Sequence, residues 1–488
     1  MELLKRNKEL LLFHIILNIA IVFFITGASY YHTPLEGGKD TLIYLVHLVI
    51  LQTTIAGFVY FLTLQKWLFR IGFSALFLFF CSFSFFAYTQ DLSVTSGLIQ
   101  AVFETTPDIA IDLITWPYML FLFFALVVLT FFIKWHNKLN NRQGVVIYSL
   151  LALSCIALFF ITERKRLNTL KSRLPYNVFY GIEDYYSAPK FQLNKTLPIV
   201  TKQKDSLTVI FVLGETVRAD HLGINGYERA TTPFLLKEEI ISYPSIFTPN
   251  TYTAASLPQL LTDKEIGVDK AMYTSIYTVA NAAGFETTWI GNQTLEKSFG
   301  PIVETNDTIL LVDKYKSEYS FNKALDGVML PELDRVLGTA KNQFITLHMM
   351  GSHWYYENRY PDTFRKYTPV ITSKYIPSLT TEEVINSYDN TILYLDYFLK
   401  EVIDRAKKNT TPTLVVYISD HGESLGENGQ FLHASKAKEQ TNPAMLFWMS
   451  DSFKTRYTAT AISIDTAKNE ALTTNIVFEY LQAIFTLK

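Results

Sequence analysis

The chain contains very few cysteines and few charged residues for its length. Cys81 and Cys155 are the only cysteines among 488 residues, and both lie within apolar runs. This placement argues against a disulfide framework and against a cysteine-based zinc site. Charged residues make up only 18% of the chain and the formal net charge is −2, so the composition does not indicate a nucleic acid as a partner. Hydrophobic residues reach 49%, which indicates that part of the chain lies in lipid.

Five long apolar segments fill the first third of the chain. They are residues 10–28, 42–64, 67–88, 116–133 and 145–161. Each approaches the roughly 20 residues that a helix needs to cross the hydrocarbon core of a bilayer. Backbone polar groups in lipid must be satisfied within the segment, which requires helices. We therefore predict a transmembrane domain of five helices over residues 1–163.

Basic residues predict the orientation of these helices. The amino terminus and the connections after the second and fourth segments carry lysine and arginine, whereas carboxylates predominate in the other connections. Lysine and arginine favour the cytoplasmic side, so five crossings place the carboxyl terminus outside. A basic stretch at 164–173 follows the fifth segment and opposes this orientation, but long translocated domains tolerate such charge.

After a polar linker at residues 164–204, the pattern changes to short strands that alternate with helices. This alternation predicts an α/β domain with a mainly parallel sheet over residues 205–488. The expected strands are 207–213, 285–290, 343–349, 413–418 and 444–449. The expected helices lie near 257 and at 273–283, 330–337, 381–406 and 475–485.

Metal-ligand residues follow two of these strands. Asp420 and His421 follow the strand at 413–418 and open what we predict to be a helix, and Glu215 follows the first strand. Ligands of open α/β sheets bind at the carboxyl ends of strands, and these residue types are zinc ligands. Taken alone, an Asp-His pair is weak evidence, and Glu215 is more simply interpreted as a helix-capping residue. Together the three residues predict a metal site.

Thr253 is a candidate nucleophile. It precedes the helix predicted near residue 257, where a threonine is most often only an N-cap. A hydroxyl at that position also faces the positive end of the helix dipole, which favours a bound anion. A zinc ion on this oxygen would lower its pKa and create an alkoxide nucleophile. Beside three metal-ligand residue types, we favour the nucleophile over the cap.

Three histidines lie close to strand ends. His348 and His353 belong to the end of the strand at 343–349 and the residues after it, so one should point toward the site and the other away. We prefer His353, because it lies past the strand end. His433 lies in the loop beyond the helix predicted after Asp420. Imidazoles in such places can bind a phosphate oxygen, serve as acid or base, or hold a second zinc ion.

Four stretches of the chain carry a resemblance to a known family. They are GETVRADHLGINGYERATTP from Gly214, the TxxSxP run at Thr253, MGSHWYYENRYP from Met350 and SDHGESLGENGQFLH from Ser419. Together they resemble the membrane-bound phosphoethanolamine transferases that modify lipid A and lipopolysaccharide core, within the alkaline phosphatase and sulfatase superfamily. The resemblance covers nearly the whole chain. It implies an α/β/α alkaline-phosphatase-like domain after five transmembrane helices, in the bacterial inner membrane with the catalytic domain in the periplasm.

The resemblance also implies roles for single residues. The positions that match zinc ligands, with Thr253 also matching the nucleophile, are Glu215, Thr253, Asp420 and His421. The positions that match substrate contacts or a second metal site are His353, His433, Glu423 and Asn292. One departure is that Pro249 and Gln259 stand where family members commonly have cysteines.

The reaction implied by the resemblance is a transfer between two lipids. Phosphoethanolamine would move from phosphatidylethanolamine to lipid A or lipopolysaccharide core through a zinc-activated threonine, in a monomer held among membrane lipids. Polymyxin resistance would follow from lost negative charge on lipid A. The alternatives are a related transferase of phosphoglycerol or another headgroup, and a sulfatase-like phosphodiesterase. A membrane scaffold without activity would be expected to lack metal ligands, and none is missing from the sequence.

Overall fold

The protein is described here by a computed structural model, in which the chain forms two compact units. One includes residues 1–105 and 110–188, and the other includes residues 189–374 and 378–488. The described residues are 8–31, 38–90, 94, 98–99, 102–103, 114–139, 145–164, 170–187, 192–194, 197, 203, 205–293, 295–296, 298–313, 324–373, 376–435 and 437–486.

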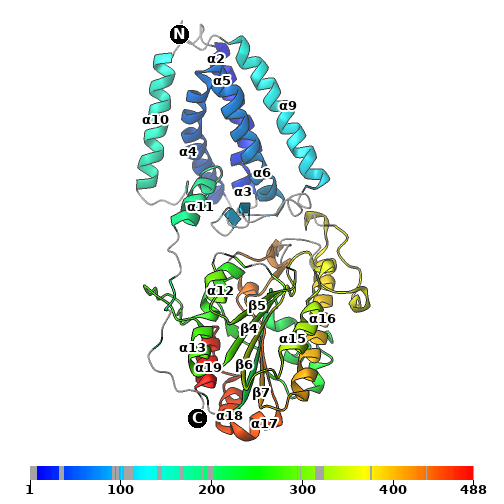
Figure 1. Cartoon of the computed structure of the whole chain (residues 1–488). Helices are drawn as coiled ribbons and strands as arrows, with labels where there is room; N and C mark the ends of the chain where they lie inside the picture. Colours follow the sequence, from blue (N-terminus) through cyan, green and yellow to red (C-terminus); the bar gives the residue numbers. More distant parts are fainter. Residues whose placement is uncertain are drawn as a thin grey trace. The chain divides into compact units, whose positions relative to one another are not determined.

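All five apolar segments of the first unit are helical (Figure 1). The helices are α2 (Lys8–Ile21) continued by a π-helical turn (Val22–Thr26), α3 (Ala28–Tyr31), α4 (Gly38–Thr63), α5 (Lys66–Leu68), a second π-helical turn (Phe69–Phe73), α6 (Ser74–Gln90), α9 (Trp116–Lys138), α10 (Val145–Arg164) and α11 (Tyr176–Ser187). Within the described residues, four helices are long and apolar enough to cross a membrane, at Lys8–Thr26, Thr41–Thr63, Lys66–Thr89 and Trp116–Lys138. The fifth segment contributes a shorter apolar helix, Tyr148–Thr162.

The second unit is built on a seven-stranded sheet. Its strands lie in the order β2-β10-β7-β1-β6-β4-β5. They are β1 (Leu207–Gly214), β2 (Ile241–Tyr243), β4 (Glu286–Gly291), β5 (Thr308–Leu311), β6 (Asn342–His348), β7 (Thr413–Ser419) and β10 (Met445–Met449). β7, β1, β6, β4 and β5 are parallel, whereas β10 runs antiparallel to both β7 and β2. The sheet is therefore mixed and mostly parallel.

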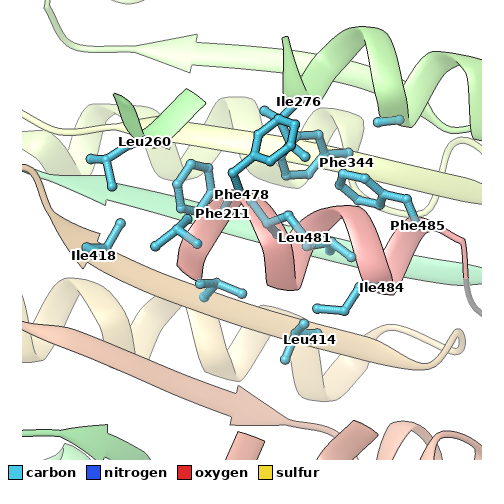
Figure 2. Packing of buried hydrophobic residues seen from close by; sticks show 14 of the residues in the cluster. Phe211, Leu260, Ile276, Phe344, Leu414, Ile418, Phe478, Leu481, Ile484 and Phe485 are labelled. Atoms are coloured by element: carbon cyan, nitrogen blue, oxygen red, sulfur yellow. The ribbon is translucent and has the colours of Figure 1, made fainter. Parts of the chain in front are cut away.

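Helices cover both faces of this sheet, because its central strands are apolar on both sides. In β1, Phe211 faces one core and Val212 faces the other. The first core includes residues of α12 (Thr253–Leu261), α13 (Ile276–Ala283) and α19 (Ile476–Phe485), and Figure 2 shows Leu481 and Phe485 of α19 packed over the sheet. The second core includes residues of α15 (Leu330–Val336) and α16 (Thr381–Lys408).

Smaller elements complete the second unit. They are β3 (Ile246–Phe247), α14 (Gly300–Val303), β8 (Ser424–Leu425), β9 (Phe431–Leu432), α17 (Asp451–Arg456), α18 (Thr458–Ala467) and β11 (Leu472–Thr473). The helix predicted after Asp420 is wrong. The chain instead forms the two-stranded β8–β9 hairpin, whose turn includes Gly426 at φ 120° and Gly429 at φ 75°, backbone conformations that an α-helix does not contain.

The register of the parallel strands brings four strand ends to one edge of the sheet. Gly214 of β1 is paired with Ser419 of β7, and Leu213 is paired with His348 of β6. Gly291 of β4 is paired with the same His348. The residues that follow these strands therefore start from neighbouring positions, although they are separated by up to about two hundred residues in the sequence.

Candidate metal centre

Three buried side chains meet at this edge and define the ligand cluster, Glu215, Asp420 and His421. One potential ligand atom from each lies within 4.8 Å of the others. The His421 Nε2 atom is 3.3 Å from Glu215 Oε1 and 3.4 Å from Asp420 Oδ2. The Nδ1 atom of His421 is 2.8 Å from the Gly422 carbonyl oxygen, a contact that directs Nε2 toward the two carboxylates.

Thr253 lies against this cluster. Its hydroxyl donates a hydrogen bond of 2.8 Å to Glu215 Oε2. Thr253 is the first residue of α12, and the N-cap position belongs to Tyr252, whose side chain makes no capping bond. The hydroxyl is thus directed at the ligand cluster, and the capping role that its sequence context suggested is not the one observed.

The pKa values of the cluster reflect two buried carboxylates that lie close together and favour a nearby positive charge. Burial and the neighbouring charge of Glu215 raise the pKa of Asp420 to about 7. Burial opposes a charged His421, but the carboxylates of Asp420 and Glu215 outweigh it and raise the pKa of His421 to about 10. Burial also opposes a charged Glu215, yet the close contact with His421 and its charge hold the pKa of Glu215 well below its usual range. The two carboxylates therefore favour a positive charge in this cluster.

The donor atoms suit a zinc ion. Asp420 Oδ2 and His421 Nε2 are buried and have no hydrogen-bond partner among the described residues. Buried polar atoms are normally satisfied, so an unpaired carboxylate oxygen and an unpaired imidazole nitrogen that lie 3.4 Å apart indicate a place for a ligand. Two carboxylates, an imidazole and an adjacent hydroxyl are oxygen and nitrogen donors of the kind that zinc takes in four-coordinate sites.

His433 and His353 extend the cluster on one side. The ring centroid of His433 is 4.7 Å from that of His421 and 5.5 Å from that of His353. Glu423 is fully buried, and its Oε1 atom is 3.4 Å from His433 Nδ1. The backbone N–H of Ala434 donates to the Thr251 carbonyl at 2.8 Å, which ties the His433 loop to the segment of Thr253.

His348 and Asn292 have other surroundings. The ring of His348 packs against Trp289 and Phe299, with centroids 5.0 and 5.7 Å away, on the first core of the sheet. The Asn292 amide donates to Asp326 Oδ1 at 2.9 Å and to the Ala324 carbonyl at 2.8 Å. The side-chain amide of Asn292 thus holds Asp326, and the described contacts of Asn292 include no residue of the ligand cluster.

Sequence reasoning missed two residues that touch the cluster. The Gln293 amide donates to Glu215 Oε2 at 3.3 Å and to the Met349 carbonyl at 2.7 Å. The Thr216 hydroxyl donates to Glu215 Oε1 at 2.6 Å. Both follow strands whose ends had been predicted, so the rule that strand ends build the site was the available signal for finding them.

Comparisons with known families agree with this fold and site. Residues 207–477 match the sulfatase family, and residues 52–187 match the family described as phosphoethanolamine transferase EptA/EptB. The first match covers more than half of the chain. The protein therefore belongs to the sulfatase family, and within it to the membrane-bound phosphoethanolamine transferases.

Two relatives illustrate this membership. Phosphoethanolamine transferase EptA of Escherichia coli K12 is 28% identical over 408 residues, which cover 76% of this chain and 74% of the relative. Kdo(2)-lipid A phosphoethanolamine 7''-transferase of the same strain is 31% identical over 261 residues, or 51% of this chain and 45% of the relative.

Two solved structures share the fold. Integral membrane lipooligosaccharide phosphoethanolamine transferase A from Neisseria meningitidis superposes with a TM-score of 0.76 at 22% identity, over 95% of this chain and 94% of that one. The periplasmic domain of EptC from Escherichia coli, in complex with zinc, gives a TM-score of 0.52 at 21% identity, over 60% of this chain and 87% of that one.

Proposed function

We propose that the protein transfers phosphoethanolamine from phosphatidylethanolamine to lipid A or lipopolysaccharide core, with Thr253 as the nucleophile and zinc as the cofactor. The observation that carries the proposal is the Thr253 hydroxyl, which donates to Glu215 inside a buried cluster of metal-ligand residues. The names of the relatives, which specify phosphoethanolamine transfer and in one case Kdo2-lipid A, support the donor group and the acceptor class.

The residues would divide the work as follows. Glu215, Asp420, His421 and the Thr253 oxygen would hold zinc, which supplies Lewis acidity that lowers the pKa of the hydroxyl and stabilises charge on phosphoryl oxygens. In the first step the Thr253 oxygen forms a bond to the donor phosphorus, and the bond from phosphorus to the diacylglycerol oxygen breaks. Diacylglycerol leaves with a proton, and a phosphoethanolamine-threonine remains.

The second step reverses the first with a different oxygen. A phosphate or sugar hydroxyl of the acceptor bonds to phosphorus, the bond to Thr253 breaks, and the hydroxyl is restored. His353 and His433 are close enough to each other to bind the phosphoryl group together, exchange the protons or hold a second zinc ion. Burial lowers the pKa of His353 to about 3, so its ring is neutral and able to accept a hydrogen bond or bind a metal.

Membrane attachment suits a reaction between two lipids. We propose that the apolar segments make five crossings, with the second unit in the periplasm of a bacterial inner-membrane protein. Holding the site at the leaflet that contains both substrates restricts the search to two dimensions and raises the rate of encounter. Lost negative charge on lipid A would reduce the binding of cationic polymyxins.

The test is mass spectrometry of lipid A and core from cells that carry the wild-type protein, the Thr253→Ala variant or no protein. We expect added phosphoethanolamine with the wild type and a fall of at least ~1,000-fold with Thr253→Ala, because the variant lacks the attacking oxygen. Thr253→Val is the matched control for helix α12, since it keeps the branched shape and loses only the hydroxyl. A Thr253→Ala protein that modifies lipid A at the normal rate would refute the mechanism.

Labelled lipids separate this function from its alternatives. Membranes are incubated with phosphatidylethanolamine or phosphatidylglycerol, each labelled in the headgroup. Label that enters lipid A only from phosphatidylethanolamine supports the proposal. Label from phosphatidylglycerol would identify a phosphoglycerol transferase, and free phosphoethanolamine without a labelled acceptor would identify a phosphodiesterase.

A further inference from the structure

We propose that Thr216 is a positioning residue of the metal centre, which holds Glu215 and Asp420 in place through two different donors. The inference rests on the proposed zinc function of the ligand cluster, and it adds a residue that would not bind the metal itself. Thr216 follows Glu215 directly and is fully buried.

The two donors of Thr216 reach two different carboxylates. Its hydroxyl donates to Glu215 Oε1 at 2.6 Å, and its backbone N–H donates to Asp420 Oδ1 at 3.1 Å. Asp420 Oδ1 also accepts the backbone N–H of His421 at 2.8 Å, so this oxygen is doubly occupied. Asp420 Oδ2 keeps no hydrogen-bond partner among the described residues, and Glu215 Oε2 accepts the Thr253 hydroxyl.

Glu215 Oε1, which accepts the Thr216 hydroxyl, also lies 3.3 Å from His421 Nε2, and Asp420 Oδ2 lies 3.4 Å from the same nitrogen. Because Thr216 donates to Glu215 Oε1 and to Asp420 Oδ1, neither carboxylate can rotate without losing a buried hydrogen bond. Partners behind metal ligands fix the orientation of the ligand, and their loss commonly weakens metal binding by about 10–100-fold. Thr216 would perform this task for two ligands from two different strand ends.

The backbone of Thr216 is held in the conformation that makes both contacts possible. Its φ is 65°, in the left-handed region that a β-branched residue rarely adopts. The Thr216 carbonyl accepts the Tyr388 hydroxyl at 2.7 Å, and that hydroxyl accepts the backbone N–H of Arg218 at 2.9 Å. Tyr388 lies in α16 and is fully buried, so the helix on the second face of the sheet anchors the turn.

The experiment measures zinc affinity in metal-stripped, full-length protein in detergent, by competition with a chromophoric chelator. Thr216→Val keeps the branched shape, and thus the same backbone cost, but lacks the hydroxyl. We expect it to bind zinc about 10–100-fold more weakly than the wild type. Thr216→Ser restores the hydroxyl and should bind within about threefold of the wild type.

Thr346→Val is the matched control. Thr346 is also fully buried in the sheet, and its hydroxyl contacts the Tyr277 hydroxyl at 3.1 Å instead of the ligand cluster. Removing that hydroxyl should change thermal unfolding of the metal-free protein about as much as Thr216→Val does, with zinc affinity unchanged. If Thr216→Val does not fold, Tyr388→Phe replaces it, because it removes the donor to the Thr216 carbonyl, and weaker zinc binding is again expected.

Two results would overturn the inference in distinguishable ways. Wild-type zinc affinity in Thr216→Val, or in Tyr388→Phe where that variant is used, would show that Thr216 only stabilises the turn, and the proposed function would stand. If Asp420→Asn binds zinc as tightly as the wild type, the ligand cluster is not the zinc site, and both the inference and the proposed cofactor fall.

Discussion

Residues beside the ligand cluster are packed so closely that adding a single carbon atom to one of them should displace a ligand residue. Gly351, in the segment after β6, has a φ of 51°, and a Cβ added there would lie 2.7 Å from the Glu215 carbonyl oxygen and 2.9 Å from its nitrogen. The next residue, Ser352, donates its backbone N–H to that carbonyl at 3.0 Å. The backbone of a metal-ligand residue therefore lies directly against a glycine that no other residue can replace without movement.

We expect Gly351→Ala to lower transferase activity at least ~10-fold, because the clash displaces the backbone of Glu215 and with it a ligand. Stability should fall by about 1–3 kcal/mol, from the backbone strain and the overlap. Transfer of labelled phosphoethanolamine and thermal unfolding measure the two effects. Gly226→Ala is the control, since Gly226 also has a positive φ, 90°, but has open space around its Cβ position. It should lose about 1–2 kcal/mol through backbone strain and keep full activity. Equal activity in both variants would contradict this account.

At the scale of elements, the position of α12 matters most, because it carries Thr253. Gln259 of α12 is buried, and its amide donates to Thr474 Oγ1 and to Asn475 Oδ1, each at 3.0 Å. The Asn250 amide in turn donates to Gln259 Oε1. The network joins α12 to the loop before it and to the start of α19, at a position where the family resemblance suggested a cysteine. Hydrogen bonds here perform the bridging that a disulfide could otherwise provide.

Gln259→Ala should destabilise the protein by about 1–3 kcal/mol, because it leaves the buried Thr474 hydroxyl and the half-buried Asn475 and Asn250 amides without their hydrogen bonds to Gln259. Thermal unfolding of the full chain measures the loss. Thr455→Ala serves as the control, because that residue is exposed and its hydroxyl donates to the Asp451 carbonyl of the same helix, α17. It should remain within about 0.5 kcal/mol of the wild type. A Gln259→Ala protein with wild-type stability would show that the network does not hold α12.

The elements also show what a sequence can and cannot predict about this fold. Strands β1, β4, β6 and β7 were predictable within a residue or so, because they are apolar runs with clear ends. The antiparallel direction of β10 was not predictable, since the apolar pattern of a buried strand is the same in both directions. Strands β2 and β5 were missed because they are short, with three and four residues.

The site likewise contains residues that the sequence predicts and residues that it does not. Metal-ligand residue types at strand ends pointed to Glu215, Asp420 and His421, which the fold brings together. Thr216 was predictable as a neighbour of the site, because it follows a strand end, but its hydrogen bonds were not, because they depend on a backbone angle and on a carboxylate about two hundred residues away. The role of Asn292 toward the substrate stays a prediction, and Gln293 beside it makes the contact with Glu215. A resemblance locates the segment, whereas the direction of each side chain depends on the turn after the strand.

For the whole molecule, the number of membrane crossings decides where the reaction takes place. Within the described residues, four helices have the length and hydropathy of a span, and the fifth segment provides a shorter apolar helix. Five crossings put the second unit on the side opposite the amino terminus, which we propose to be cytoplasmic, whereas four would put both on the same side. Only the first arrangement gives the site access to lipid A on the outer face of the inner membrane.

The scarcity of cysteine makes this question testable in the intact chain. Replacing Cys81 and Cys155 by alanine removes every thiol, and single cysteines are then placed at Lys438 of the second unit or at Lys138, at the end of α9. Both positions are exposed. With five crossings, a membrane-impermeant maleimide should label the Lys438→Cys variant in intact spheroplasts, and the Lys138→Cys variant only after lysis. With four crossings, the two positions lie on one side and react alike. That result would place the ligand cluster away from its proposed acceptor and would contradict the proposed transfer, even if the cluster binds zinc.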